Sequence, residues 1–448
     1  MNYGFFRVAA ASPSVKVADC DYNICEIKKY IENADKKGAE LIVFPELCIT
    51  GYTCSDLFFQ TQLIKSAKDA LCSLAEGTKE LDILYAVGLP VHYRNSLYNC
   101  AAFVKKGRIL ALIPKTNIPN YSEFYEVRNF TSAASMGEHG IDYVSLSENQ
   151  KDIPFGTDII ICDEKDSSIA VAAEICEDLW VPCPPSTRHA IAGAAIIANL
   201  SASNEIIGKS DYRRMLIQSH SGRLSSAYVY ADAGSGESTT DLVFAADNFI
   251  AENGSVLARS EKFSDGFIIH DVDIEKLMQQ RRRQNTYPDF TKADYKRIFV
   301  PLQKDKNDFI RNIECRPFVP DNEEERSCRC QEINTLQAEG LAKRLRHTNA
   351  KSAVIGLSGG LESTLALLVT VEAFRLAKLE LSGITAVTMP GFGTTDRTYT
   401  KAMILAKESG AALLEVSIKD AVIQHFKDIS HDINVHDVTY ENSQARER

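Results

Sequence analysis

The sequence lacks several features that would place it in a specialised protein class. None of its twelve cysteines forms a CxxC pair, so we expect neither a disulfide framework nor a zinc ribbon, and most thiols should be buried. No run of about 18 uncharged apolar residues is present, and the N-terminal residues lack the basic and apolar regions of a signal peptide. We therefore expect no membrane span and a cytoplasmic location.

Basic residues are not in excess. The chain has 50 Lys and Arg against 60 Asp and Glu, which gives a formal net charge of −10. Acids and bases are interspersed, which argues against nucleic-acid binding and favours a protein that handles small molecules. At 448 residues, 45% of them hydrophobic, the chain exceeds what one core usually supports, so two or three domains are expected.

Short apolar runs alternate with longer amphipathic stretches over residues 1–275. FFRVAAAS, LIVFPE and LYAVGLPV have the composition of buried strands, and the stretches between them have helical periodicity. Further apolar runs predict more strands, with hairpin turns at Lys105–Gly107 and Asn253–Gly254. Many strands with few helices predict two sheets covered by helices, an α/β fold of the four-layer α-β-β-α type.

The pattern changes between residues 276 and 328, where prolines and charged residues replace any strand period, and a linker is expected. From residue 329 to 448 helical and strand patterns alternate, which predicts the start of a doubly wound parallel sheet. Such a domain needs more strands than precede Arg448. We therefore expect this second domain to be incomplete at its C-terminal side.

Three apolar strands of the first domain each end in a reactive side chain. LIVFPE ends in Glu46, ILALIPK in Lys115 and SIAVAAEIC in Cys176. Taken singly, the charged residues are typical of solvated strand ends and the cysteine of a buried thiol. Taken together they can form a catalytic set for amide hydrolysis. A thiol nucleophile needs a base, and the attacked amide needs a positively charged donor to stabilise its oxyanion. We predict Cys176 as the nucleophile, Glu46 as the general base and Lys115 as the oxyanion donor.

The second domain contains a glycine-rich turn between an apolar strand and a helix, residues 353–363, AVIGLSGGLES. Glycines allow close backbone approach, and a helix N-terminus presents free amides and a positive dipole end. These features favour a nucleotide phosphate, although an ordinary strand-to-helix turn has the same composition. The turn is neither a Walker loop nor a dinucleotide fingerprint, because GxxxxGK[ST] and GxGxxG are absent.

Together these motifs resemble the glutamine-dependent NAD synthetase family. FPELCITGY, PKTNIPNYSEFYEVRNF and EICEDLW resemble its nitrilase-like glutaminase domain, over residues 1–275. SGGLES resembles the SGGxDS loop of the ATP pyrophosphatases, and TMPGFGTTDRTY, HFKDIS and DVTYENSQARER resemble the NAD synthetase branch. The resemblance implies that L-glutamine is hydrolysed through a Cys176 thioester. It also implies that ATP adenylates deamido-NAD with release of pyrophosphate, and that ammonia then displaces AMP to give NAD.

The same resemblance implies roles for individual residues. Glu126 would orient the lysine and the attacking water, and L-glutamine would be bound by Tyr121, Glu177, Ser203 and Lys209. Lys209 stands where the family often has arginine, and a lysine is a point charge rather than a planar fork. The residues that would bind ATP are Gly356, Leu357, Ser358, Gly359, Gly360, Leu361, Glu362, Ser363 and Met389, and those that would bind deamido-NAD are Asn442 and Arg446.

Plain structural roles compete with several of these assignments. Tyr121 and Phe124 could instead be core residues and Glu177 a capping acid, and a solvated helix face explains Asn442 and Arg446 equally well. Glu362 departs from the family pattern, because it replaces the aspartate that binds Mg²⁺ there. Since Mg²⁺ demands near-ideal octahedral geometry, the longer side chain either binds the ion through water or lowers synthetase activity sharply.

The resemblance further implies an internal ammonia tunnel and a homo-oligomer. Three alternatives stay open at this point. The chain could be a stand-alone nitrilase-like amidase with a non-functional nucleotide domain, or a non-enzymatic nucleotide-binding subunit. It could also be another ATP pyrophosphatase, such as a GMP or asparagine synthetase, although those use glutaminase domains of other types.

Overall fold

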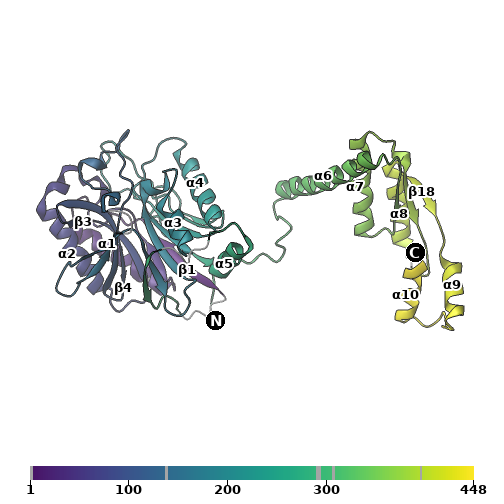
Figure 1. Cartoon of the computed structure of the whole chain (residues 1–448), viewed down its shortest axis with the longest axis horizontal. Coiled ribbons are helices and arrows are strands. Elements are labelled where there is room, and N and C mark those ends of the chain that lie inside the picture. The colour runs from purple at the N-terminus through teal and green to yellow at the C-terminus, as the bar shows by residue number, and fades with distance from the viewer. Residues whose placement is uncertain (1–3, 137–139, 289–293, 305–307, 394–395, 448) are drawn as a thin grey trace. The chain divides into compact units, whose positions relative to one another are not determined.

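The structure is a computed structural model that describes residues 4–136, 140–288, 294–304, 308–393 and 396–447. The chain divides into two compact units, Met1–Asn312 and Ile313–Arg448 (Figure 1). Unit 1 contains two large sheets with helices outside them, and unit 2 contains a small parallel sheet with helices.

The first sheet of unit 1 has eight strands in the order β14-β1-β2-β3-β4-β5-β7-β6. Strands β1, β2 and β3 are parallel, whereas β3, β4 and β5 form an antiparallel meander. The bounds in that order are Ile268–Asp273, Phe5–Ala10, Leu41–Val43, Leu84–Tyr93, Ser96–Lys105, Arg108–Pro114, Ile153–Phe155 and Asp142–Val144.

The second sheet has seven strands in the order β13-β12-β11-β10-β9-β8-β15, and β9, β10 and β11 are parallel. The bounds in that order are Ser255–Arg259, Phe249–Glu252, Ala227–Ala231, Ile196–Leu200, Ala170–Ile175, Ile159–Asp163 and Lys296–Val300. The helices of unit 1 are α1 (Cys20–Lys36), α2 (Thr61–Gly77), α3 (Pro185–Ile191), α4 (Lys209–Leu224) and α5 (Ile274–Arg283). In the described part of unit 1, short 3-10 segments join these elements: η1 (Tyr52–Phe59), η2 (Glu126–Arg128), η3 (Ala133–Met136) and η4 (Cys176–Leu179).

Alternation along the strands creates three apolar layers. Phe6 and Val8 of β1 and Val171 and Ile175 of β9 belong to one apolar core between the two sheets. The opposite face of the first sheet packs on α1 and α2, and the opposite face of the second sheet packs on α4. In Figure 1, α2 and α4 lie at opposite sides of unit 1. The predicted four-layer α-β-β-α sandwich is confirmed.

Local sequence signals explain much of this arrangement. Helix α1 begins where the Asp19 side chain accepts a hydrogen bond from the Tyr22 amide, and it buries Ile27, Ile31 and Ala34 at helical spacing. Strand β4 turns into β5 through Lys106 and Gly107, and β12 turns into β13 through Asn253 and Gly254. Both hairpins follow the predicted turns.

The stretch 276–328, expected to be a linker without strands, differs from that expectation in its first part. It completes α5 and supplies β15, which pairs in parallel with β8 at the edge of the second sheet. Lys296 and Arg297 begin β15, none of its residues is fully buried, and its apolar run of Ile298, Phe299 and Val300 is short, so the sequence gives only a weak strand signal there. Unit 1 extends accordingly to Asn312.

Unit 2 has three parallel strands in the order β16-β17-β18, with bounds Ala353–Gly356, Ile384–Thr388 and Ala412–Glu415. Its helices are α6 (Glu323–Thr348), α7 (Leu361–Ala377), α8 (Asp396–Ser409), α9 (Lys419–Asp428) and α10 (Val438–Glu447), with a short turn η6 (Leu381–Gly383). A core that includes Leu345, Phe374 and Ala386 joins α6, α7 and β17. Each strand-helix alternation predicted for residues 329–448 is present.

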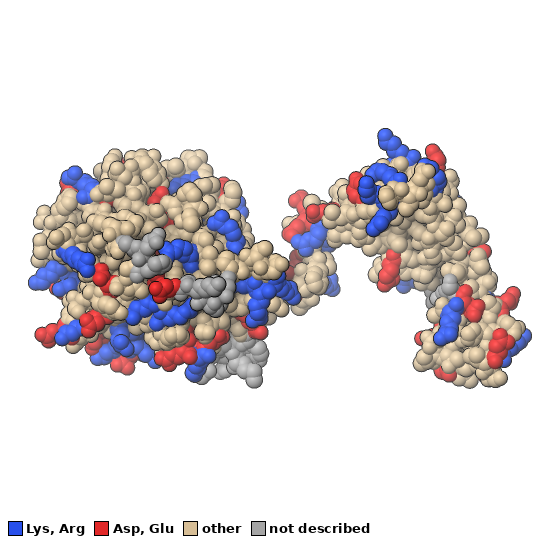
Figure 2. All heavy atoms as spheres, in the orientation of Figure 1, with Lys and Arg blue, Asp and Glu red and all other residues tan. Residues whose placement is uncertain are grey.

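Surface charge matches the composition. Figure 2 shows acidic and basic residues interspersed over the visible face of unit 1. Among the described residues, no helix combines the length and apolar character needed to cross a membrane.

Candidate active sites

The three reactive residues predicted in unit 1 all follow strand ends. Glu46 comes three residues after β2 and Lys115 directly after β5, and these strands run in the same direction within the first sheet. Cys176 directly follows β9 of the second sheet. The loop that carries Glu46 lies against β3 at Gly88, where an added Cβ would come within 2.2 Å of the Leu47 nitrogen. Only glycine permits that close approach.

Lys115 lies at the centre of a buried ionic cluster. Its Nζ is 2.6 Å from Glu46 Oε1 and 2.8 Å from both carboxylate oxygens of Glu126. Glu46 and Lys115 are fully buried, and Glu126 is 6% exposed. Glu46 also accepts hydrogen bonds from Asn99 Nδ2 at 2.6 Å and from the Ala202 amide at 3.0 Å. These contacts fix both carboxylates on one ammonium group.

The cluster changes the acid–base properties of its members. Desolvation disfavours charge on Lys115, but the neighbouring Glu126 and Glu46 outweigh it and hold the pKa of Lys115 well above its ordinary value. Burial raises the pKa of Glu126 to about 7 against the lowering effect of Lys115. Burial and the charge of Glu46 raise the pKa of the Cys176 thiol well above its ordinary value. The resting thiol is therefore neutral and gives up its proton only when a base accepts it.

Cys176 lies at a strained turn. It begins η4 with φ of +45°, a left-handed conformation that a non-glycine residue rarely adopts. Its side chain is 5% exposed at the boundary of the inter-sheet core. A strained strand-to-helix turn of this kind is a recurrent way to present a nucleophile at a strand end.

The residues predicted to bind glutamine form two groups beside this turn. Tyr121 is 53% exposed, and its hydroxyl donates to the Glu177 carboxylate at 3.0 and 3.1 Å. Burial and Glu177 raise the pKa of Tyr121 to about 12, and burial raises the pKa of Glu177. Tyr121 is thus a surface residue rather than the core position that competed with the binding role.

Lys209 and Ser203 form the second group. Lys209 Nζ donates to Asn204 Oδ1 at 2.5 Å and lies 5.3 Å from the Trp180 ring centre and 5.4 Å from that of Phe124. Burial lowers the pKa of Lys209, although the nearby acids Asp232 and Glu123 oppose this. Ser203 is buried, and its amide donates to Asp232 Oδ1 at 2.8 Å.

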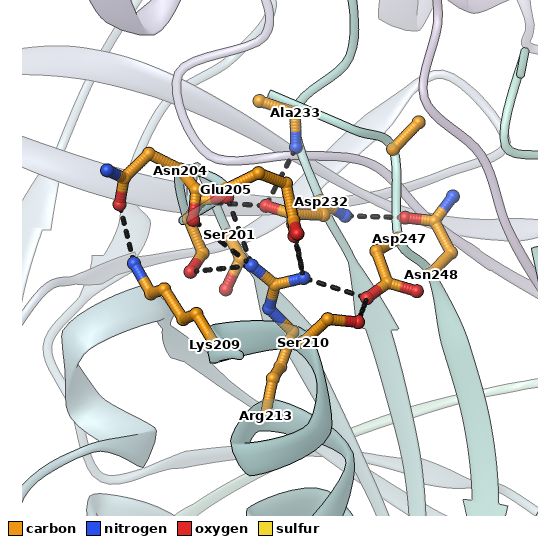
Figure 3. A network of polar contacts seen from close by, with 12 residues as sticks. Ser201, Asn204, Glu205, Lys209, Ser210, Arg213, Asp232, Ala233, Asp247 and Asn248 are labelled. Carbon is orange, nitrogen blue, oxygen red and sulfur yellow. Dashed lines mark hydrogen bonds and ion pairs between the residues drawn. The ribbon is translucent and has the colours of Figure 1, made fainter. Parts of the chain in front are cut away.

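A buried arginine, Arg213, lies beside Glu205 and Asp247 in a network of polar contacts (Figure 3). Arg213 of α4 is fully buried, and its Nη1 lies 2.5 Å from Glu205 and 2.8 Å from Asp247. Its Nη2 donates to Ser203 Oγ at 3.2 Å, and to the carbonyl oxygens of Ser203 and Asn204. Arg213 therefore holds Ser203, a predicted glutamine contact, one residue after the Ala202 amide that donates to Glu46.

A pocket of about 400 Å³ opens beside the ionic cluster. Glu126 and Tyr52 form part of its wall, and the Tyr52 hydroxyl donates to Glu126 Oε1 at 2.8 Å. Glu123, Arg128 and Asp241 supply charged groups around it. A small polar molecule thus has space next to the buried carboxylates.

The glycine-rich turn of unit 2 links β16 to α7 as predicted. Gly359 has φ of +80°, and an added Cβ would come within 2.2 Å of the Thr398 carbonyl oxygen. Ser358 Oγ lies 3.1 Å from Ser363 Oγ and accepts from the Gly360 amide at 3.3 Å. The residues around a pocket of about 370 Å³ include the predicted positions Gly356, Leu357, Ser358, Gly360 and Met389.

Other predicted nucleotide contacts lie around this turn or on α10. Glu362 is exposed in the first turn of α7, and its Oε2 would lie 3.5 Å from a Cβ added at Gly360. Leu361 is 86% exposed. Asn442 and Arg446 are exposed on α10, whose buried neighbour Gln444 accepts from the Gly393 amide at 2.8 Å. Within the segment TMPGFGTTDRTY, residues 394 and 395 lie outside the described residues.

Sequence comparison supports both halves of this arrangement. The carbon–nitrogen hydrolase family model matches residues 7–282, and the NAD synthase family model matches residues 333–448. The glutamine-dependent NAD(+) synthetase of Mycobacterium tuberculosis H37Rv is 37% identical, over 99% of this chain and 67% of that protein. The Aquifex aeolicus protein of the same name is 28% identical, over 99% of this chain and 71% of that protein.

The chain belongs to the glutamine-dependent NAD(+) synthetase family. A solved glutamine-dependent NAD(+) synthetase from Cytophaga hutchinsonii has the same fold, with a TM-score of 0.53 and 23% identity, over 99% of this chain and 71% of that chain. The match to the carbon–nitrogen hydrolase model lies within unit 1, and the match to the NAD synthase model lies within unit 2. The family resemblance seen in the sequence motifs is confirmed.

In this family member, several residues with clear roles in the geometry escaped the sequence analysis. They are Tyr52, Asn99, Asp178, Asn204 and Arg213. Asn99 lies within β4, and Arg213 lies within a helix that has little amphipathic pattern, so neither ends a strand next to a motif. Asp178 stands inside EICEDLW, which also contains Cys176, and Tyr52 ends FPELCITGY, which also contains Glu46, so proximity to a motif was the signal available for these two residues.

Proposed function

We propose that unit 1 hydrolyses L-glutamine to glutamate and ammonia, and that unit 2 uses ATP and the ammonia to convert deamido-NAD into NAD. The observation that carries the proposal is the ammonium of Lys115 held between Glu46 and Glu126, beside the strained Cys176 turn. In the same proposal, residues 1–275 are the glutaminase domain and residues 329–448 belong to the synthetase domain.

The glutaminase step follows from the arrangement of charges. Cys176 Sγ attacks the side-chain amide carbon of glutamine, and its proton passes to Glu46. Lys115 donates a hydrogen bond to the developing oxyanion. The leaving nitrogen then takes up the proton from Glu46 and the C–N bond breaks. Ammonia departs, and a thioester between Cys176 and the glutamyl group remains. Water hydrolyses the thioester with Glu46 as base, and Glu126 helps to orient Lys115 and the water.

The raised pKa of the Cys176 thiol is compatible with this sequence of steps. A thiol kept neutral by burial reacts when its proton leaves during attack, and Glu46 is positioned to take it. The hydrogen bond from the Ala202 amide to Glu46 holds the second carboxylate oxygen in place. Glu46 can therefore receive a proton without moving away from Lys115.

Four residues around the turn are proposed to bind the substrate glutamine. Tyr121 and Glu177 form an exposed pair, and Glu177 as an acid suits the α-amino group. Lys209, whose ammonium is near Asn204 and two aromatic rings, suits the α-carboxylate. Ser203 supplies a further hydrogen-bonding group.

In unit 2, ATP is proposed to bind at the glycine-rich turn. The amides of Gly359, Gly360 and the first turn of α7 would hold its phosphates, with the hydroxyls of Ser358 and Ser363. Met389, in the wall of the adjacent pocket, would lie near the base. Deamido-NAD would be bound with the help of Asn442 and Arg446. Adenylation of its nicotinate carboxylate releases pyrophosphate, and ammonia then displaces AMP.

Mg²⁺ fits this turn through one protein carboxylate. The Glu362 carboxylate lies over Gly360 at the start of α7, and Mg²⁺ commonly binds through one or two carboxylates together with phosphate oxygens and waters. When bound, the ion would neutralise phosphate charge. No group of three or more acidic, histidine or cysteine side chains suited to a metal occurs among the described residues.

We also propose a cytoplasmic homo-oligomer that acts on small molecules and binds neither nucleic acid nor membranes. Unpaired side chains at all twelve cysteines support a reducing compartment. The interspersed surface charge of unit 1 supports small-molecule rather than nucleic-acid partners.

Ammonia release from L-glutamine tests the glutaminase proposal. The parent chain should release ammonia and Cys176→Ala should not, because the variant lacks the attacking sulfur. Equal release by both proteins would contradict the proposal. NAD formation from deamido-NAD and ATP, measured with glutamine and separately with ammonium, tests the synthetase half. Glutamine hydrolysis by a chain whose unit 2 binds no ATP would instead favour a stand-alone amidase with a non-functional nucleotide domain.

A further inference from the structure

Asp178 joins the two strand ends that carry the nucleophile and the lysine. It lies in η4, two residues after Cys176, and is 2% exposed. Its Oδ1 accepts hydrogen bonds from the Asn117 amide and from Asn117 Nδ2, both at 2.8 Å. Its Oδ2 accepts from the Ile175 amide at 3.1 Å and from the Thr116 amide at 3.5 Å.

The donors belong to two different sheets. Ile175 ends β9 directly before Cys176, whereas Thr116 and Asn117 directly follow Lys115 at the end of β5. β9 lies in the second sheet and β5 in the first. A single buried carboxylate therefore links the backbone at the nucleophile to the backbone at the oxyanion donor.

The turn at Cys176 needs such support. The φ of +45° at a non-glycine residue is unfavourable unless surrounding contacts fix it. The Ile175 amide, one residue before the strained position, donates to Asp178. Burial and the charge of Glu174 raise the pKa of Asp178 to about 6, so the group is a carboxylate, able to accept all four hydrogen bonds, above that pH.

We propose that Asp178 is a positioning residue for the glutaminase reaction, which fixes the Cys176 sulfur relative to the Lys115 ammonium through these backbone hydrogen bonds. The inference rests on the proposed function for the identity of the substrate, but its geometric content concerns only the relative positions of Cys176 and Lys115. A displacement of about 1 Å between reacting groups lowers a rate by about 100-fold, so the loss of this link should have a large kinetic effect.

Asp163 provides a matched control. It is 1% exposed, and it accepts hydrogen bonds from the amides of Lys165, Asp166, Leu302 and Gln303. It ends β8, whose pairing with β9 places it at the end of β9 opposite to Cys176. Asp163→Ala thus removes a comparable buried acceptor of amide hydrogen bonds without touching the nucleophile turn.

The experiment compares the parent chain with Asp178→Ala, Asp178→Asn, Asn117→Ala and Asp163→Ala. The first readout is the rate at which iodoacetamide alkylates Cys176, followed by mass spectrometry of the Cys176 peptide. The second is kcat and KM for ammonia release from glutamine. The third is thermal unfolding, so that each rate is measured well below the melting temperature of that variant.

Asp178→Ala should lower both the alkylation rate and kcat by about 100-fold. Asp178→Asn, with one acceptor oxygen left, should lie between it and the parent. Asn117→Ala removes one donor while Asp178 stays in place, and it should lower both rates several-fold even if neither Asp178 variant folds. Asp163→Ala should keep both rates within about 2-fold of the parent despite its lower melting temperature.

Equal losses of Cys176 reactivity in folded Asp178→Ala and Asp163→Ala would overturn the inference, because both would then act through general stability. If the Asp178 variants do not fold, an unchanged rate in Asn117→Ala would overturn it. Failure of the proposed function has a different signature. In that case the parent releases no ammonia from glutamine, while alkylation of Cys176 still separates the Asp178 and Asp163 variants.

Discussion

The two units hold their proposed reactive groups in opposite ways. In unit 1, Glu46 and Lys115 are completely buried and bonded to each other before any substrate arrives. In unit 2, Leu361 and Val354 are 86% and 72% exposed at the proposed nucleotide turn, and Glu362 is exposed as well. Unit 1 relies on charges fixed inside the protein, whereas unit 2 relies on backbone amides that a ligand would cover. Substitutions should therefore affect stability far more in unit 1.

Lys115→Met should produce the largest effect, because it leaves Glu46 and Glu126 buried together without their cation. Removing one partner of a buried ionic group typically costs about 3–5 kcal/mol, and glutaminase activity should fall by at least about 1,000-fold with the oxyanion donor gone. Denaturant unfolding of unit 1 and ammonia release measure the two losses.

Lys105→Met is the matched control. Lys105 is also a buried lysine of the first sheet, but its partner Asp82 is 46% exposed and can be rehydrated. We expect a loss of about 1 kcal/mol and unchanged glutaminase activity. A stability loss in Lys115→Met no larger than that in Lys105→Met would break the contrast between buried and exposed charges.

Arg213→Lys should have the next largest effect. A lysine keeps the charge but cannot reach Glu205, Asp247 and the carbonyl oxygens of the 203–204 segment at the same time. We expect a loss of about 2–3 kcal/mol in unfolding free energy and a higher KM for glutamine, because Ser203 loses its support.

Arg128→Lys is the control for Arg213→Lys, because Arg128 forms an exposed ion pair with Asp56. The free energy of unfolding of Arg128→Lys should fall by less than about 1 kcal/mol. Steady-state kinetics and denaturant unfolding of both variants distinguish the cases, and an unchanged KM in Arg213→Lys would show that this network does not position the substrate segment.

Two buried histidines should make the stability of unit 1 depend on pH. Burial lowers the pKa of His189 and of His220 to about 4, so both are neutral in the folded state at neutral pH. In the unfolded chain the imidazoles of His189 and His220 have an ordinary pKa of about 6.5 and bind protons below that pH. The stability that each supplies is present above that value and is lost as pH falls toward about 4.

His189→Gln should remove part of this acid sensitivity. Between pH 7.5 and pH 5, the parent should lose about 2 kcal/mol more unfolding free energy than the variant, and His189→Gln/His220→Gln should about double the difference. Denaturant unfolding at the two pH values measures it. Parallel losses in all three proteins would mean that neither histidine is kept neutral by folding.

The fold and the clustering of residues at the centre of the proposed glutaminase site were predictable because strand ends are visible in the sequence. Glu46, Lys115 and Cys176 each follow an apolar run, and parallel strands deliver such residues to one edge. Residues placed by tertiary contacts were not predictable. Arg213 reaches the site from a helix that has no apolar stripe, and Asn99 reaches it from the middle of a strand, so no local period marks either one.

β15 shows the same limit in the fold itself. Two of its five residues, KRIFV, are charged and all five are partly or fully exposed, and their pairing with β8 depends on a strand more than 130 residues earlier. Long-range pairing of a short, partly exposed edge strand leaves little periodic signal. The Glu126 carboxylate was recovered from resemblance rather than from pattern, because it lies in a loop segment.

Glu362→Asp should have the smallest effect on stability and so tests the unit 2 side of the comparison. The side chain is exposed at the first turn of α7, where an aspartate is as favourable as a glutamate, so unfolding free energy should change by less than about 0.5 kcal/mol. The substitution should change Mg²⁺-dependent ATP binding rather than stability.

If Glu362 contacts Mg²⁺ through its carboxylate, the shorter side chain alters the fit of the ion. The Mg²⁺ dependence of ATP binding should then shift by about tenfold, whereas binding without Mg²⁺ should be unchanged. Calorimetric titration of ATP with and without Mg²⁺ gives both values, and Glu372→Asp, a change further along the same helix, should shift neither. Identical Mg²⁺ dependence in Glu362→Asp and the parent would show that this carboxylate does not hold the ion.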